Sequence, residues 1–351
     1  MKILYVTFGY FPAEGWGGPL KVVQQHALEL RKRGYEVAVV ASNLYSKSER
    51  IENGSFSRVI DDIEVHYLQT YVLSSWPGTL GPSMLSQSSS RKLKDIVSKF
   101  DVVHVNGLRN AVCMQALRYA HALDVPVVLQ PHGTLQYIGN SIRLKKAYDA
   151  VAVSPLLSDV KAYIALQEEE RQQIVAAGVE PARVHLVPNG IAMRTARQGE
   201  DQEQFRRNFR ISHDKKIILF IGRINRKKGT DLLVEAFALI PEQVRQELQL
   251  VIAGPDDGQL QTVQELIARN GLEEQVTLTG LLTGEDVWQA YNSCDLFVLP
   301  CRTDTFPMAI VEACAAGKSM VVTDTCEIAD LLRDKAALVV PVDTRLNVGH
   351  V

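Results

Sequence analysis

The chain has 351 residues, of which 46% are hydrophobic and 22% are charged, and its formal net charge is −2 at pH 7. This length predicts two domains, at roughly 150 residues per domain, and the composition is that of an ordinary globular protein. The near-zero net charge argues against a nucleic-acid partner, because the chain as a whole does not attract a polyanion.

The five cysteines are scattered along the chain and include no Cys-x-x-Cys pair. This usage argues against a zinc site and a disulfide framework, and it favours a cytoplasmic protein. The apolar start of the chain is similar to a weak signal peptide, but Thr7 and Gly9 interrupt it, so we interpret it as a first buried strand. No run approaches the roughly 18 apolar residues of a membrane-spanning helix, so none is expected.

Residues 1–190 alternate short β-branched runs with longer amphipathic stretches. Apolar residues at helical spacing predict a helix over Leu20–Arg33, which Gly34 ends. The predicted strands are Ile3–Thr7, Val37–Ala41, Ile63–Leu68, Val102–Val105, Val125–Gln130, Ala162–Leu166 and Val184–Val187. Strands that alternate with helices indicate βαβ units and a parallel sheet. The stretch Ser74–Ser90, rich in Ser, Gly and Pro, predicts a long loop.

The polar segment Thr195–Lys216 predicts a solvated helix and a linker. We therefore place an N-terminal domain at residues 1–190, a linker region at 191–212 and a C-terminal domain at 213–351. The predicted strands of the second domain are Ile217–Ile221, Leu250–Ala253, Val276–Thr279, Leu296–Leu299, Met320–Thr323 and Leu338–Val340. The predicted helices are Thr230–Ile240, Leu260–Asn270, Glu285–Asn292, Met308–Ala316 and Cys326–Arg333.

The segment from Pro300 to Glu312 follows a predicted strand and enters a predicted helix, with Pro307 in its first turn. Backbone N–H groups at a helix start favour an anion. Asp304 on the loop and Glu312 on the helix suit sugar or ribose hydroxyls, because carboxylates accept hydrogen bonds from pairs of OH groups. By itself, the pair fits a solvated helix face equally well.

The segment Gly222–Gly229 also follows a strand and opens a helix, and it contains Arg223, Arg226, Lys227 and Lys228. Cations are unfavourable at the positive end of a helix dipole, so we expect the loop to hold an anion such as a diphosphate. The alternative is an exposed basic loop.

Three other loops carry weaker signals. The glycine cluster around Gly17 and Gly18 fits a flexible loop, and Trp16 beside it fits either stacking on a sugar or packing. His132 ends a predicted strand, where a lone histidine is usually structural. Gly254–Gly258 contains two aspartates but lacks the spacing of a calcium loop. An acid at Glu327 is expected in the first turn of a helix, where the dipole favours it.

Together, these motifs resemble the retaining glycosyltransferases of family 4. That family has a Glu, seven residues and a second Glu, with a Phe just after the first, and a Gly-Arg…Lys-Gly phosphate motif. Here Asp304 replaces the first Glu, Glu312 is the second, and Phe306-Pro307 lies between them. The resemblance covers nearly the whole chain. It implies an α/β fold of the GT-B type, in which two Rossmann-like domains face each other across a ligand-binding cleft, with a second domain shorter than is usual.

The resemblance also implies roles for individual residues. Arg223 and Lys228 bind the donor diphosphate, Asp304 and His132 contact the donor sugar, and Glu312 holds the ribose. The remaining positions expected at the nucleotide-sugar are Gly17, Gly18, Phe306, Pro307 and Met308. No cofactor is expected, because the nucleotide-sugar is itself a substrate. No metal is expected, because the resemblance implies an enzyme of the GT-B type, which generally needs none, and no metal motif is visible.

The implied function is transfer of a sugar, with retention, from a UDP- or GDP-linked donor to a glycan or lipid-linked acceptor in polysaccharide or glycolipid synthesis. Two alternatives stay open, a non-catalytic nucleotide- or glycan-binding protein and a sugar-nucleotide epimerase. Two basic clusters fit either a peripheral contact with the anionic inner face of the membrane or a solvated helix face. These clusters contain Arg91, Lys92, Lys94, Arg143, Lys145 and Lys146.

Overall fold

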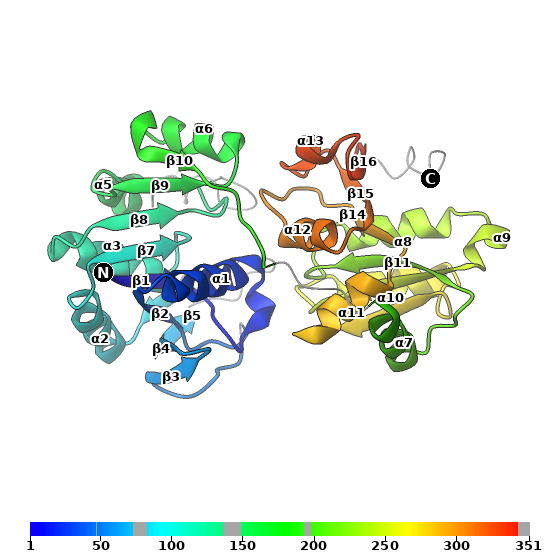
Figure 1. The fold of residues 1–351 in the computed structure, drawn as a ribbon, viewed down its shortest axis with the longest axis horizontal. Helices are drawn as coiled ribbons and strands as arrows, with labels where there is room; N and C mark the ends of the chain where they lie inside the picture. The colour runs from blue at the N-terminus through cyan, green and yellow to red at the C-terminus, as the bar shows by residue number, and fades with distance from the viewer. Residues whose placement is uncertain (47, 73–82, 136–148, 193–197, 343–351) are drawn as a thin grey trace. The chain divides into compact units, whose positions relative to one another are not determined.

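The computed structural model describes residues 1–46, 48–72, 83–135, 149–192 and 198–342. The chain divides into two compact units, Met1–Gly190 and Ile191–Val351 (Figure 1). The basic residues Arg143, Lys145 and Lys146 lie outside the described ranges. None of the helices in the described part of the chain combines the length and apolar character that a membrane span requires.

The first unit is built on an eight-stranded sheet of order β10-β9-β8-β7-β1-β2-β4-β3. Its pairings are parallel except that β3 runs antiparallel to β4. The strands are β1 Lys2–Thr7, β2 Glu36–Ser42, β3 Phe56–Ile60, β4 Ile63–Leu68, β7 Val102–Asn106, β8 Val127–Gln130, β9 Ala162–Ala165 and β10 Val184–Leu186, and β5 Thr70–Val72 pairs separately with β6 Ser83–Leu85.

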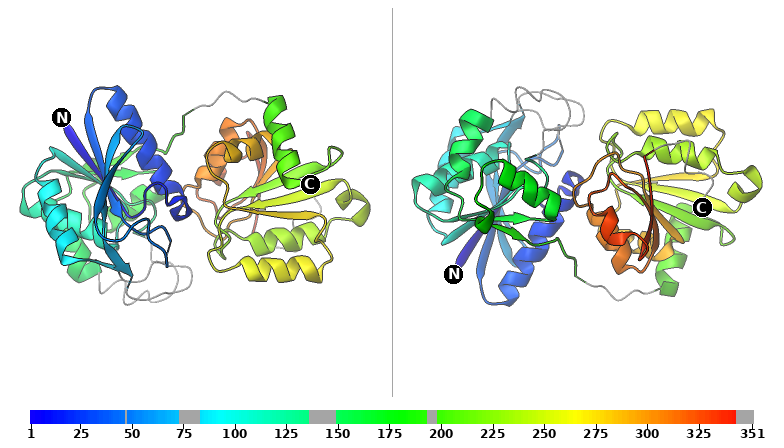
Figure 2. Two further views of the ribbon diagram at one scale, coloured as in Figure 1. Left: turned by 90° about the horizontal axis from the view of Figure 1, so that it is seen from below. Right: turned by 90° about the horizontal axis from the view of Figure 1, so that it is seen from above.

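Helices cover both faces of this sheet (Figure 2). They are α1 Gly18–Lys32, α2 Gln87–Val97, α3 Ala111–Ala122, α5 Ser154–Leu157 and α6 Glu168–Ala176, with the short turns η1 Glu14–Trp16, η2 Asp149–Val153 and η3 Pro181–Arg183. Side chains alternate along each strand, so that Tyr5 packs in one apolar cluster with α1, and Leu4 and Val6 pack in another with α2 and α3. The central parallel strands of the sheet are therefore buried on both faces.

The seven strands predicted in the first half are all present. The edge strand β3 was not predicted, because most of its side chains are exposed and its burial does not alternate along the strand. The predicted loop Ser74–Ser90 is wrong from Ser83 onward, where β6 and α2 form; its residues 74–82 lie outside the described ranges. Ser86 explains the error, because its hydroxyl accepts a hydrogen bond from the Ser89 N–H at 3.2 Å and so caps α2.

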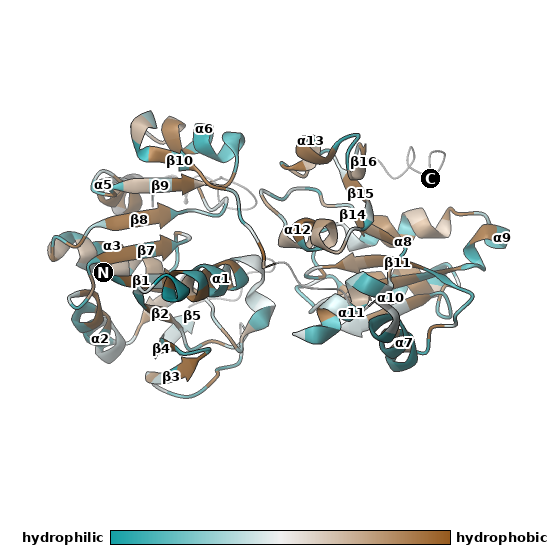
Figure 3. Cartoon of the chain, in the orientation of Figure 1, coloured by the Kyte–Doolittle hydropathy of each residue, from teal (hydrophilic) through white to brown (hydrophobic). Residues whose placement is uncertain are grey.

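The second unit contains a six-stranded parallel sheet of order β13-β12-β11-β14-β15-β16. The strands are β11 Lys216–Ile221, β12 Leu248–Ala253, β13 Val276–Gly280, β14 Leu296–Leu299, β15 Ser319–Thr323 and β16 Ala337–Val340. The helices are α7 Gln198–Phe209, α8 Thr230–Ala238, α9 Glu242–Arg245, α10 Leu260–Arg269, α11 Glu285–Ser293, α12 Met308–Ala315 and α13 Ala329–Leu332. Apolar strands such as β11 lie between these helix layers, as the hydropathy colours show (Figures 2 and 3).

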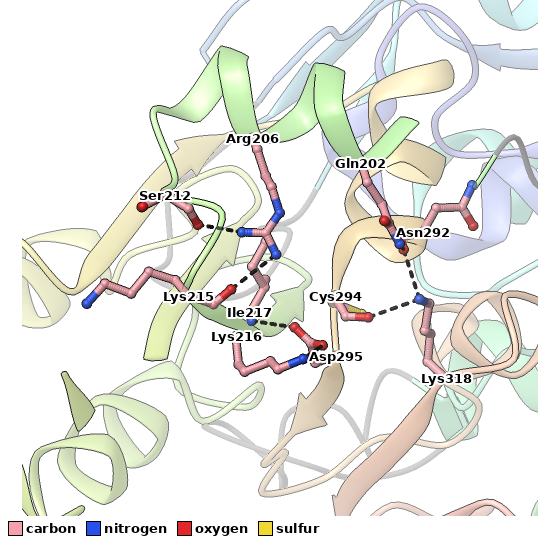
Figure 4. A network of polar contacts seen from close by, with 10 residues as sticks. All are labelled: Gln202, Arg206, Ser212, Lys215, Lys216, Ile217, Asn292, Cys294, Asp295 and Lys318. Atoms are coloured by element: carbon pink, nitrogen blue, oxygen red, sulfur yellow. Dashed lines mark hydrogen bonds and ion pairs between the residues drawn. The ribbon is translucent and has the colours of Figure 1, made fainter. Parts of the chain in front are cut away.

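The helix predicted between Thr195 and Lys216 is present as α7, but it belongs to the second unit rather than to a linker. Its surface is polar in Figure 3, yet Phe205 is 0% exposed and packs in the core of the second unit. Gln202 donates to the Asn292 carbonyl oxygen at 3.0 Å, and Arg206 donates to the carbonyl oxygens of Ser212 and Lys215 (Figure 4). The helix is thus part of the second unit. The sequence did not indicate this, because the composition of the segment is mostly polar.

Candidate functional site

Two predicted loops of the second unit meet where the strand order reverses. β11 has β12 on one side and β14 on the other, so the loops after β11 and β14 leave neighbouring strands at the same edge of the sheet. Ligands of open parallel sheets bind at such a switch point. The loop after β11 is Gly222–Gly229, and the loop after β14 starts at Pro300 and leads to α12.

The two loops are joined by charged contacts. Lys228 forms an ion pair with Asp304, and both side chains are largely buried. Arg302 donates its backbone N–H to the Lys227 carbonyl oxygen at 2.7 Å. The guanidinium of Arg302 also binds both carboxylate oxygens of Asp231 on α8, at 2.7 Å each. The structure therefore brings a predicted phosphate ligand and a predicted sugar ligand together.

Arg223, the other predicted phosphate ligand, is held by an aspartate. Its Nη1 lies 2.9 Å from Oδ2 of Asp257, and the same oxygen accepts a bond from Asn225 Nδ2 at 2.9 Å. The side-chain oxygen of Asn225 accepts the Lys228 N–H at 3.0 Å. Asn225 and Asp257 therefore order the phosphate loop, a role that sequence reasoning missed because the contact spans 34 residues.

The aspartates after β12 serve as hydrogen-bond acceptors. Asp256 Oδ1 accepts the backbone N–H groups of Gly258, Gln259 and Leu260 at the start of α10, while Asp257 holds Arg223. Within the described ranges, no group of three His, Cys, Asp or Glu side chains is placed to hold a metal ion.

Two glycines allow the loops to pack against each other. A Cβ atom on Gly229, where φ is +70°, would lie 2.0 Å from the carbonyl oxygen of Pro300. A Cβ atom on Gly254 would lie 1.8 Å from the carbonyl oxygen of Gly222. Real atoms never approach so closely, so both positions require glycine for space as well as for backbone conformation.

Helix α12 begins at Met308, with Pro307 as the preceding cap residue. Proline has no side-chain acceptor, so it leaves the N–H groups of the first turn uncapped by its own side chain. Pro307 and Met308 are buried, and Phe306 packs against the core of the second unit. This is the helix start expected for anion binding.

Glu312 lies in the second turn of α12 and is only 6% exposed. Its Oε2 accepts a hydrogen bond at 2.9 Å from the hydroxyl of Tyr291, a residue of α11 that is 0% exposed. Burial, followed by the charge and hydrogen bond of Glu312, raises the pKa of Tyr291 well above its ordinary value. The phenol therefore keeps its proton at neutral pH and acts as a hydrogen-bond donor. Sequence reasoning did not find Tyr291.

Glu327 is not in a helical first turn. The predicted helix Cys326–Arg333 shortens to α13, which begins at Ala329, because the preceding residues pair with the acid loop. Cys326 forms a β-bridge with Asp304, and the Glu327 N–H donates to the Asp304 carbonyl oxygen at 2.9 Å. The backbone at Glu327 thus supports the position of Asp304.

In the first unit, the loop after β1 leads into α1 through the predicted glycines. Gly17, with φ at +93°, is the cap residue of α1, and Gly18 is its first residue. Trp16 packs against its own unit. Its ring lies edge-on to that of Phe8, with the two ring centroids 5.0 Å apart, and its Nε1 donates to the Leu44 carbonyl oxygen at 3.0 Å. Of the two interpretations of Trp16, the structure therefore supports packing.

His132 follows β8 in the same unit and is partly buried. Its backbone is in the left-handed region, with φ at +53°, and its Nε2 lies 3.1 Å from Oδ1 of Asn106 at the end of β7. Burial, together with nearby His26, lowers the pKa of His132 to about 3. The imidazole is therefore neutral near pH 7.

A buried polar shell holds the loop of His132. Glu170 on α6 is 0% exposed, and its two oxygens accept the N–H groups of Gly133 at 2.6 Å and Leu166 at 2.8 Å. Arg109 donates to the carbonyl oxygens of Thr134 and Leu135 and binds the buried carboxylate of Asp149. Sequence reasoning missed this shell, because Arg109, Asp149 and Glu170 come from three separate segments of the chain.

Comparison with known proteins gives the same division into halves. Residues 17–190 match a family model described as a glycosyl transferase 4-like domain, and residues 201–345 match one described as glycosyl transferases group 1. An uncharacterized glycosyltransferase of Methanocaldococcus jannaschii is 25% identical over 351 residues, covering 95% of this chain and 83% of the relative. D-inositol 3-phosphate glycosyltransferase 1 of Catenulispora acidiphila is 31% identical over 176 residues, covering 48% of this chain and 42% of the relative.

A solved structure shows the same fold. The crystal structure of Anabaena HepE with UDP-glucose superposes with a TM-score of 0.73 at 19% identity, covering 98% of this chain and 87% of HepE. The fold and the two matched domains define the class: the chain is a glycosyltransferase of the GT-B type. The predicted fold class and enzyme class are both confirmed.

Proposed function

We propose that this glycosyltransferase is a retaining enzyme of family 4 that moves a sugar from a UDP- or GDP-linked donor to a glycan or lipid-linked acceptor. The ion pair between Lys228 and Asp304 carries the proposal, because it joins the phosphate loop to the acid motif at the switch point. HepE was crystallised with UDP-glucose, which supports a nucleotide-sugar donor. The Catenulispora relative is named for D-inositol 3-phosphate, a compound that bears hydroxyl groups.

The main task of the second unit is to stabilise the departing diphosphate. Breaking the donor bond leaves an oxocarbenium-like sugar and a negatively charged leaving group. Arg223 supplies a forked guanidinium, Lys228 a point charge and the start of α12 a set of N–H donors. Removal of one such donor typically lowers the rate on the order of a hundred- to a thousand-fold.

The other residues hold the sugars. Glu312 accepts hydrogen bonds from the ribose hydroxyls, and Asp304 contacts the donor sugar. His132 also contacts the donor sugar rather than acting as a general base, because a pKa of about 3 makes it a weak base. Gly17 and Gly18 allow backbone to approach the donor phosphates and the acceptor. No resident cofactor or metal takes part in this scheme.

We place the enzyme in polysaccharide or glycolipid assembly in the cytoplasm, with peripheral contact at the inner face of the membrane. Helix α2 presents exposed Arg91 and Lys94, and Lys92 reaches Ser57 Oγ at 3.4 Å. Basic side chains near an anionic bilayer contribute about 1 kcal/mol each. Sedimentation with anionic liposomes tests this placement: binding that Arg91→Ser and Lys94→Ser weaken supports it, and no binding contradicts it.

The first test of the reaction is calorimetric titration of UDP, GDP and ADP into the protein, Glu312→Ala and a control, Glu273→Ala, at an exposed acid. One nucleotide is expected to bind, and Glu312→Ala alone is expected to abolish the heat. Turnover with the matching sugars follows, with the anomeric configuration of the product read by NMR. Binding without turnover would instead indicate a non-catalytic binding protein, and isomerised donor would indicate an epimerase.

A further inference from the structure

Tyr291 and Glu312 form a buried polar contact inside the second unit. The Tyr291 hydroxyl lies 2.9 Å from Oε2 of Glu312 and 3.1 Å from the carbonyl oxygen of Ala309. Both partners are on α12, while Tyr291 comes from α11. A charged carboxylate is the stronger acceptor of the two, so the phenolic proton is directed to Glu312.

The tyrosine ring packs against two aromatic neighbours. Its centroid lies 5.7 Å from that of Phe297 on β14 and 6.1 Å from that of Trp288 on α11. A fully buried ring with such neighbours has little rotational freedom, so its hydroxyl stands at a fixed point. The donor is therefore pre-organised before any ligand binds.

We propose that Tyr291 is a positioning residue that orients the Glu312 carboxylate for the ribose of the donor nucleotide. A donor fixed on Oε2 sets the plane of the carboxylate and so the direction of Oε1. Recognition of a pair of hydroxyls requires that direction to be held closely. This inference rests on the proposed role of Glu312 at the ribose, and it adds the group that enforces the preference for a ribonucleotide.

If the Tyr291 hydroxyl had a purely structural role, its removal would have a different effect on nucleotide binding. If Tyr291 only joined α11 to α12, its loss would weaken the fold and would affect every nucleotide alike. If it orients Glu312, its loss weakens binding only of nucleotides whose ribose hydroxyls Glu312 accepts. Comparison of ribo- and 2′-deoxyribonucleotides separates these two cases.

The experiment is calorimetric titration of UDP, GDP and their 2′-deoxy counterparts into the wild type, Glu312→Gln and Tyr291→Phe. Tyr163→Phe is the matched control, because Tyr163 is also buried and its hydroxyl donates to the Leu157 carbonyl oxygen in the first unit. Urea unfolding of each variant verifies that it is folded. Tyr291→Phe is expected to reduce the ribo/deoxy preference by about three- to tenfold, the effect of one hydrogen bond.

If Tyr291 orients Glu312, the affinity of Tyr291→Phe for deoxynucleotides stays unchanged. Glu312→Gln then loses most of the preference for ribonucleotides over deoxyribonucleotides, and Tyr163→Phe keeps it. An equal loss for ribo- and deoxynucleotides, or no loss, would overturn the role of Tyr291 while leaving the proposed function intact. A preference that survives Glu312→Gln would overturn the assignment of Glu312 and this inference with it. Absence of nucleotide binding by the wild type would overturn both.

Discussion

Lys228, the last cation of the loop after β11, is ion-paired with Asp304, the first acid of the loop after β14. The two residues are 76 positions apart in the sequence and are brought together because β11 and β14 are neighbours. Each charge lowers the cost of burying the other. A diphosphate bound at this loop would share the lysine with Asp304, so the pair links leaving-group binding to sugar binding.

Catalytic activity is expected to be sensitive to replacement of Lys228 by an uncharged residue. Lys228→Met is expected to lower kcat by about a hundred- to a thousand-fold, because it removes a cation that stabilises the leaving diphosphate. Arg226→Met is the control, since Arg226 is an exposed cation on the same loop. Steady-state kinetics with the donor selected by calorimetry measure the effect. Comparable losses in the two variants would show that only the net charge of the loop matters.

The glycine at the end of this loop is expected to be intolerant of a side chain. Gly229→Ala adds a Cβ atom against the Pro300 carbonyl oxygen as well as left-handed strain. Gly271→Ala is matched to it, because Gly271 has φ at +63° with nothing within 4 Å of an added Cβ. We expect Gly271→Ala to cost about 1–2 kcal/mol of unfolding free energy from strain alone.

Gly229→Ala is expected to cost more than Gly271→Ala and also to weaken nucleotide binding, because the clash displaces Lys228 from the acid loop. Urea unfolding and calorimetry give the two readouts. Equal destabilisation of the two variants, with unchanged nucleotide affinity, would contradict the close approach of the two loops.

The stability of the first unit is expected to depend on pH through His104 of β7. Burial lowers its pKa to about 3, whereas the unfolded value is 6.5. Between these values the unfolded state binds the proton and the folded state does not. The unfolding free energy therefore falls as the pH falls from 6.5 toward 3, by about 1.4 kcal/mol per pH unit for one such group.

His26 and His132 have lowered pKa values and act in the same direction. His104→Leu is accordingly expected to flatten the dependence between pH 6 and pH 4 without abolishing it. Hydrogen exchange of the β7 peptide in urea, at several pH values, reports on this unit separately from the second. An unchanged slope would show that His104 is protonated in the folded protein.

Replacing Glu170 by glutamine is expected to destabilise the first unit. Both of its oxygens accept backbone N–H groups, so in Glu170→Gln the NH2 group faces a donor and one buried N–H loses its acceptor. The expected cost is about 1–3 kcal/mol of unfolding free energy at pH 7. Glu169→Gln, an exposed neighbour on α6, is the control. If the two variants unfold at the same urea concentration, Glu170 does not hold the loop of His132.

Local patterns in the sequence determined the order of elements and where the loops of the candidate site occur. Alternating β-branched runs and amphipathic stretches predicted both sheets, and the residues of Gly222–Gly229 and Pro300–Glu312, with the family motifs that they resemble, predicted the two candidate loops. These elements and loops can be predicted from the sequence, because they depend on residues that are only a few positions apart. They did not reveal α7 as part of the second unit, since one buried Phe205 among polar residues leaves almost no periodic signal.

The tertiary structure alone decided which side chains are partners. The contacts of Lys228 with Asp304, Arg223 with Asp257 and Tyr291 with Glu312 cross between elements, and they depend on strand order and on how helices pack. Packing is set by the whole core rather than by any one segment, so no local pattern specifies these pairs. The sequence determined where the chemical groups occur along the chain, and the fold determined what each group binds.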